Sequence, residues 1–128
     1  MWLQCRKNSL NFVLSVCYYP PKPVYDASVF LGQISEGLDY VVNYVPCEFV
    51  AIAGDFNSLD TDFLETDLGF VQLVQQLTHG PNLIDKFFIN RPDLYTSAAT
   101  YTSIVKTKHK AVIVQPSTVR VLQTLQLT

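Results

Sequence analysis

The sequence predicts a layered α/β or α+β sandwich. A strand, an amphipathic helix and a second strand follow one another between residues 11 and 53. Several short apolar segments with strand character come after them, with few helices between. Apolar residues make up 48% of the 128 residues and charged residues 16%, which suits one globular domain. We expect that domain to span residues 1–117, followed by a tail over 118–128 of unknown structure.

The first strand is predicted over Asn11–Tyr19, which is rich in Val, Phe, Tyr and Leu and is ended by two prolines. A helix is predicted from the N-cap residue Asp26 to Pro46, and Gly32 and Gly37 weaken it. Its apolar residues recur every three or four positions, so we expect the whole stripe to be core. The stripe consists of Val29, Phe30, Ile34, Leu38, Val41, Val42 and Val45.

The second strand is predicted over Glu48–Ala53, directly after the helix. Two arrangements fit this strand, helix and strand. The helix could cross between parallel neighbouring strands, or it could pack between strands that are not adjacent in a mixed sheet. The sequence leaves both open.

The second half of the chain is predicted to be mostly strands. Ser58–Gly69 is acidic and should form a loop with a short helix, and Phe70–Leu77 alternates apolar residues with glutamines. A third buried strand is expected over Asn82–Asn90. A fourth and a fifth are expected over Ala99–Val105 and Ala111–Gln115.

The overall charge gives no reason to expect a polyanionic partner, because the formal net charge is −2. The one dense basic run is Lys106, Lys108, His109 and Lys110. Such a run is either a local phosphate-binding patch or a solvated loop, and both interpretations stay open here. The three cysteines are widely spaced, which argues against a disulfide framework or a zinc site and is typical of a reducing compartment.

We expect an intracellular protein, nuclear or cytoplasmic, without a membrane partner. The apolar stretch Phe12–Tyr19 is too short to span a bilayer. Arg6 and Lys7 precede this stretch as they would in a signal peptide, but no small-residue cleavage pattern follows. A strand is therefore the preferred interpretation of this segment.

Five polar residues share one context, because each lies at the end of an apolar strand or within one. They are Tyr18, Asp55, Asn57, Asp85 and His109. An imidazole beside a carboxylate can stabilise negative charge on a phosphate, and a second carboxylate can orient or deprotonate a water. Asp55 and Asn57 could instead form an Asx turn after their strand. A carboxylate such as Asp85 in an apolar strand needs a partner, which could also be structural.

The motifs around these residues resemble the endonuclease/exonuclease/phosphatase superfamily, in particular the endonuclease domain of non-LTR retrotransposons. The matching segments are residues 17–21 (CYYPP), 53–57 (AGDFN), 73–80 (LVQQLTHG), 83–88 (LIDKFF) and 107–109 (TKH). The resemblance covers residues 13–114 and implies a four-layered α/β sandwich of the DNase I-like type, built on two mixed β-sheets. It also implies magnesium-dependent cleavage of phosphodiesters, with DNA as the partner.

The resemblance also implies a role for each of the five polar residues. Tyr18 would contact the scissile phosphate, Asp55 would orient or deprotonate the attacking water, and Asn57 would bind a phosphate oxygen. Asp85 would pair with His109, which would stabilise charge that develops on the phosphate. The resemblance gives no role to Lys106 and Lys108, but their charge makes both candidates to contact substrate phosphate.

Two features of this chain differ from the family pattern. The N-terminal half of the domain, with an asparagine and the principal magnesium-binding glutamate, is expected to be missing. Lys108 also stands where the family has a metal-binding aspartate, and an ammonium repels a divalent cation. We therefore expect a fragment of a magnesium-dependent DNA endonuclease that retains no complete metal site and has little or no activity alone. The alternatives are a non-catalytic nucleic-acid-binding remnant and a phosphatase of the same fold.

Overall fold

A mixed sheet of five strands forms the centre of the computed structural model, which describes residues 1–103 and 107–117. The strand order is β1-β2-β3-β5-β4, and β2 and β3 are parallel while the other neighbours are antiparallel. The bounds are β1 Trp2–Lys7, β2 Leu10–Tyr18, β3 Phe49–Asp55, β4 Val71–Gln72 and β5 Asp85–Ile89. Two helices, α1 Ala27–Tyr44 and α2 Asp62–Thr66, and an antiparallel pair, β6 Tyr95–Tyr101 and β7 Ala111–Pro116, complete the fold.

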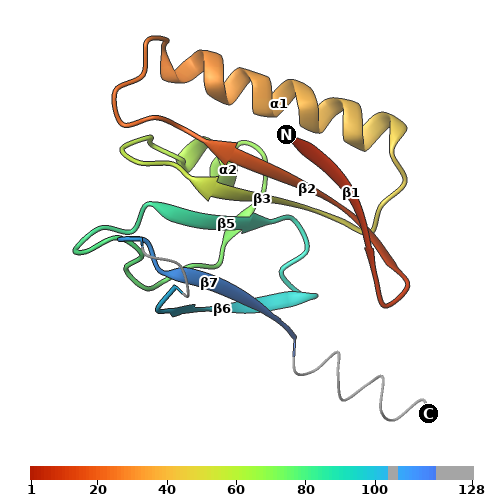
Figure 1. The fold of residues 1–128 in the computed structure, drawn as a ribbon. Helices are drawn as coiled ribbons and strands as arrows, with labels where there is room; N and C mark the ends of the chain where they lie inside the picture. The colour runs from red at the N-terminus through yellow and green to blue at the C-terminus, as the bar shows by residue number, and fades with distance from the viewer. Residues whose placement is uncertain (104–106, 118–128) are drawn as a thin grey trace.

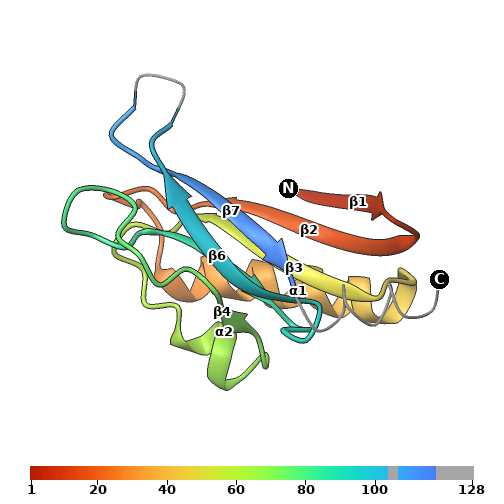
Figure 2. The same ribbon diagram turned by 90° about the horizontal axis from the view of Figure 1, so that it is seen from below.

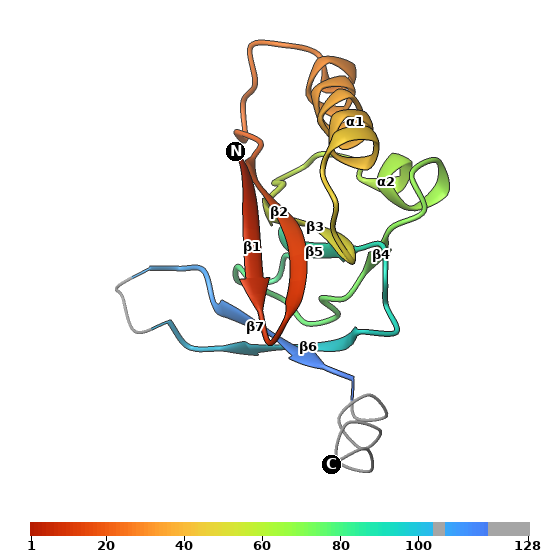
Figure 3. The ribbon, with the colours of Figure 1, turned by 90° about the vertical axis from the view of Figure 1, so that its right-hand side faces the viewer.

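These elements are arranged as three layers. Helices α1 and α2 lie on one face of the five-stranded sheet, and the β6–β7 pair lies against the opposite face (Figure 1). Figure 2, seen from below, shows β6 and β7 in front of the sheet and crossing β3, and Figure 3 shows the helices and the β6–β7 pair on opposite sides of the sheet. The predicted α/β or α+β class with a mixed sheet is confirmed at this level.

The strand, helix and strand at the start of the chain confirm one of the two predicted arrangements. Strands β2 and β3 are direct parallel neighbours, paired from Phe12 with Phe49 to Tyr18 with Asp55, and α1 connects them. Helix α1 begins directly after Asp26 and ends before Pro46, as predicted. The pairing matters for function because it brings the last residues of both strands to the same edge of the sheet.

Strand β1 was not predicted. It pairs with β2 along its whole length, and a loop of only two residues, Asn8 and Ser9, joins the two strands. Both loop residues have positive φ, 51° and 67°, which is the geometry of a type I′ hairpin turn. The basic residues Arg6 and Lys7 are exposed positions of this strand.

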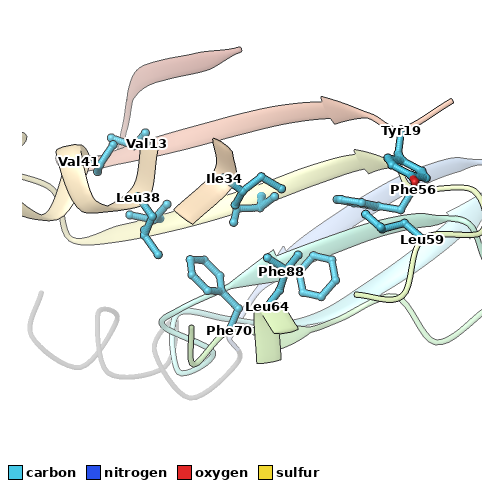
Figure 4. Packing of buried hydrophobic residues seen from close by; sticks show 12 residues of the cluster. Val13, Tyr19, Ile34, Leu38, Val41, Phe56, Leu59, Leu64, Phe70 and Phe88 are labelled. Carbon is cyan, nitrogen blue, oxygen red and sulfur yellow. The ribbon is translucent and has the colours of Figure 1, made fainter. Parts of the chain in front are cut away.

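The larger core lies between the helices and the sheet. Phe56, Leu64 and Phe88 are fully buried at its centre, and Figure 4 shows the side chains of α1 packed over the sheet beside them. The prediction that the whole apolar stripe of α1 is core was wrong. Ile34, Leu38 and Val41 are buried, but Val29 and Val42 are exposed. One residue advances the helix by about 100°, so Val42 cannot face the sheet together with its neighbour.

A second core fills the space between the sheet and the β6–β7 pair. It is built from Phe49, Ala51, Leu73, Ile89 and Leu94. The ring of Phe12 stacks on Phe49 at a centroid distance of 4.7 Å. This packing holds the β6–β7 pair against the face of the five-stranded sheet opposite the helices. The segment that enters β7 is held there with it.

The strand predicted over Ala99–Val105 is shifted in the structure, where β6 spans Tyr95–Tyr101. Residues 104–106, including the candidate Lys106, and the tail 118–128 lie outside the described residues. Of the predicted Phe70–Leu77 segment only Val71–Gln72 is strand. Among the helices of the described residues, none combines the length and apolarity needed to cross a membrane.

The two glycines of α1 are expected to respond differently to alanine. A Cβ at Gly32 meets nothing within 4 Å, so Gly32→Ala should gain up to about 1 kcal/mol from helix propensity alone. A Cβ at Gly37 would lie 2.5 Å from the ring of Trp2, so Gly37→Ala must displace that ring and should lose the gain. Chemical denaturation measures both effects, and Trp2, the single tryptophan, reports the displacement by fluorescence. Equal stabilisation by the two variants, with unchanged emission, would contradict this packing.

Candidate active site

Three polar side chains lie in one row at the edge of the sheet. Asp55 is the last residue of β3 and Asp85 is the first residue of β5, and the two are direct antiparallel partners. Tyr18, the last residue of β2, is the parallel partner of Asp55. Partners on neighbouring strands point to the same face of a sheet, so all three side chains face the β6–β7 layer.

His109 lies between the two carboxylates. Its Nδ1 is 2.8 Å from Oδ2 of Asp85, and its Nε2 is 3.8 Å from Oδ2 of Asp55. The imidazole is 36% exposed and each carboxylate is 20% exposed. Residues that are 24 positions or more apart in the chain therefore meet at a partly desolvated point that a ligand can still reach.

Thr78 connects the two segments that carry Asp85 and His109. Its side chain is fully buried, and its Oγ1 accepts hydrogen bonds from the backbone N–H of Ile84 at 3.2 Å and of Asp85 at 3.0 Å. Its carbonyl oxygen accepts the backbone N–H of Lys110 at 2.8 Å. One buried residue thus fixes both the start of β5 and the approach to β7.

Asp55 and Asn57 form a turn and also contribute to the site. The backbone N–H of Asn57 donates to Oδ1 of Asp55 at 3.0 Å, which is an Asx turn, and Asn57 has a φ of 43°. The side-chain Nδ2 of Asn57 donates to the carbonyl oxygen of Tyr19 at 2.6 Å. The turn alternative is therefore present, and it leaves Oδ2 of Asp55 directed at His109. Asn57 Nδ2 keeps a second N–H for a ligand.

The two adjacent tyrosines lie on opposite faces of the sheet. Tyr18 is 62% exposed on the face of Asp55, whereas Tyr19 is 5% exposed and packs its ring against Phe30 and Tyr25 on the side of the helix. Of the two, only Tyr18 is free to contact a ligand at this edge.

The basic residues of the predicted cluster take different positions. Lys106 lies outside the described residues, and Lys108 is exposed beside His109 in the chain. Lys110 lines a cavity together with Asp55 and Asp85. Of the lysines in the predicted basic cluster, the structure therefore places Lys110 at the edge where the carboxylates meet.

A second imidazole, His79, was interpreted from the sequence as a loop residue without chemistry. Its ring lies 4.6 Å from the ring of His109, centroid to centroid, at an interplanar angle of 48°. Both rings line a cavity of about 370 Å³, together with Asn57, Ser58 and Asn82. His79 belongs to residues 73–80, one of the segments that match the family, and this match was the signal in the sequence that could have identified it.

Two carboxylates and one imidazole make up the donor set for a cation at this site. Ligand atoms of Asp55, Asp85 and His109 lie within 4.8 Å of one another, close enough to share a cation. Mg²⁺ prefers octahedral oxygen ligands, several of them waters, and each carboxylate keeps one oxygen that is not hydrogen-bonded to His109 or to Asn57. Within residues 1–103 and 107–117, no further carboxylate joins this group.

The arrangement holds one imidazole in a fixed place between two carboxylates. Asp85 holds Nδ1 of His109 and so fixes the ring and its tautomer, while Nε2 faces the space beside Asp55. The Cys17 thiol behind this edge adds no charge, because burial raises its pKa above the ordinary value.

Comparison with protein-family models, curated proteins and solved structures finds no match for this chain. The family resemblance therefore stays a prediction from the motifs.

Proposed function

We propose that the chain carries the phosphodiester site of an endonuclease/exonuclease/phosphatase domain of the retrotransposon type. The observation that carries the proposal is the position of the His109 ring between Asp85 and Asp55, at 2.8 and 3.8 Å. In this proposal the described layers belong to a truncated four-layered sandwich, and DNA is the partner.

Each residue of the site has a role in the proposal that its position permits. As an imidazolium oriented by Asp85, His109 donates its Nε2–H to a phosphate oxygen and stabilises the charge that develops there. Asp55 orients a water or takes its proton through the carboxylate oxygen that faces the same space. Tyr18 and Asn57 contact the phosphate from the flanking strand end and turn.

The isolated chain is expected to turn over little or no substrate. Metal-assisted phosphodiester hydrolysis needs a cation that offsets several kcal/mol of transition-state charge, and Lys108 puts an ammonium where the family has a metal-binding aspartate. In a plasmid-nicking assay with Mg²⁺, the chain should nick no faster than its Asp55→Ala variant. Robust nicking that Asp55→Ala abolishes would overturn the expectation of inactivity.

Binding tests the proposed site independently of turnover. An abasic DNA oligonucleotide should bind, and His109→Ala should weaken binding about tenfold, since a hydrogen bond to a charged group contributes about 1.5–3 kcal/mol. Binding that His109→Ala leaves unchanged would argue against this site. Preference for a phosphoinositide over the oligonucleotide would instead favour the phosphatase alternative.

Nucleic-acid binding without catalysis is the second candidate function, and the exposed Lys108 beside Lys110 favours it. If these lysines neutralise phosphates, binding should weaken steeply as salt increases. The double variant Lys108→Gln/Lys110→Gln should reduce that salt dependence, whereas His109→Ala should not. No binding even at low salt would end this alternative.

A further inference from the structure

A cavity of about 580 Å³ lies between the two sheets at the edge that carries Asp55 and Asp85. Strands from both layers form its walls. The apolar side chains of its lining are Val16, Ala53, Phe87, Val112 and Val114. The cavity is separate from the smaller one beside His79, and the proposed roles of the site residues do not use it.

Side chains alternate between the two faces of a strand, and on each strand the charged and the apolar residues of this lining share one face. Lys110, Val112 and Val114 alternate along and just before β7, so they face the sheet together. Ala53 and Asp55 alternate in the same way on β3. The cavity therefore has a charged end next to the proposed phosphate site and an apolar end deeper between the sheets.

Asp85 and Phe87 repeat this alternation on β5, whereas Lys86 between them faces the helix side. Its Nζ donates to Oγ1 of Thr61 at 2.9 Å, which directs its charge away from the cavity. Lys110 remains as a cation at the charged end. In the part of the chain that the structure describes, its ammonium has no ion-pair partner within 4.0 Å.

We infer that this cavity binds the aromatic group of a phosphate ester whose phosphate lies at Asp55 and His109. The inference rests on the proposed function and names the substrate class of that site. The volume falls in the range of small-molecule sites, which are mostly apolar with a few convergent polar groups. Phe87 offers a ring for aromatic packing, and Lys110 lies where it can neutralise the ester phosphate.

Two probes that differ only in the organic group test the inference. Methyl phenyl phosphate and dimethyl phosphate, both phosphodiesters, are titrated by NMR into the full chain with Mg²⁺ present. Methyl phenyl phosphate should bind at least about tenfold more tightly, because the ring is removed from water in the cavity. Ala53→Leu fills the cavity and should abolish this difference, and Val112→Phe should do the same from the opposite wall.

Ala111→Leu is the matched control. This substitution adds the same atoms as Ala53→Leu, but on the face of β7 that points away from the cavity. It should leave the tenfold preference intact. Equal affinity of the two probes for the unmodified chain would overturn the inference and leave the proposed phosphate site standing. Binding of neither probe would overturn the proposed function and this inference with it.

Discussion

Gly54→Ala is expected to destabilise the fold by about 3 kcal/mol or more, since it forces overpacking between two backbones. Gly54 pairs with Cys17 across the parallel strands β2 and β3. A Cβ at this position would overlap the Cys17 carbonyl oxygen and would lie 2.7 Å from its carbonyl carbon. Neither atom can move without moving β2, so the variant separates the strands that carry Tyr18 and Asp55.

Chemical denaturation measures this loss, and Gly69→Ala is its control. Gly69 has a positive φ, 74°, but a Cβ there meets nothing within 4 Å. Gly69→Ala should therefore cost only the backbone strain of about 1 kcal/mol. If Gly54→Ala unfolds at the same denaturant concentration as Gly69→Ala, the close approach of β2 and β3 is wrong.

Thr78→Val is expected to cost about 2–3 kcal/mol although the two side chains have nearly the same shape. The fully buried Thr78 hydroxyl accepts the backbone N–H of Ile84 and of Asp85. Valine leaves both groups without an acceptor, and a buried unsatisfied donor costs about 1–3 kcal/mol. The start of β5, where Asp85 meets His109, should loosen with it.

Thr78→Ser keeps the hydroxyl and separates the hydrogen bonds from the packing. It should cost about 1 kcal/mol, the loss of one buried methyl group, and retain the phosphate binding that Thr78→Val weakens. Hydrogen exchange at the amides of Ile84 and Asp85 locates the effect. Protection of these amides that survives in Thr78→Val would contradict the role assigned to the hydroxyl.

The sequence predicted the first half of the fold because its signals there are strong. Two prolines end β2, Asp26 and Pro46 bound α1, and the apolar run before Gly54 is continuous. Strand β1 was missed because Arg6 and Lys7 dilute its apolar pattern and its hairpin loop, Asn-Ser, lacks the glycine that usually marks a type I′ turn.

The meeting of the site residues depends on pairing that a single sequence specifies poorly. The motifs predicted that Asp55, Asp85 and His109 matter, but the register that makes the two aspartates direct partners is a tertiary property. His79 was missed for the same reason. Its place beside His109 depends on a backbone bridge between segments 30 residues apart, which the matching segment 73–80 does not indicate by itself.

The most direct test of the central claim is a backbone NMR titration of the chain with dimethyl phosphate in the presence of Mg²⁺. We predict that the amide resonances of Asp55, Asn57, Asp85 and His109 shift together and saturate at one ligand concentration, and that His109→Ala removes the response. Shifts confined to the region of Lys108, or no saturable shift at these four residues, would contradict a phosphodiester site at this edge of the sheet.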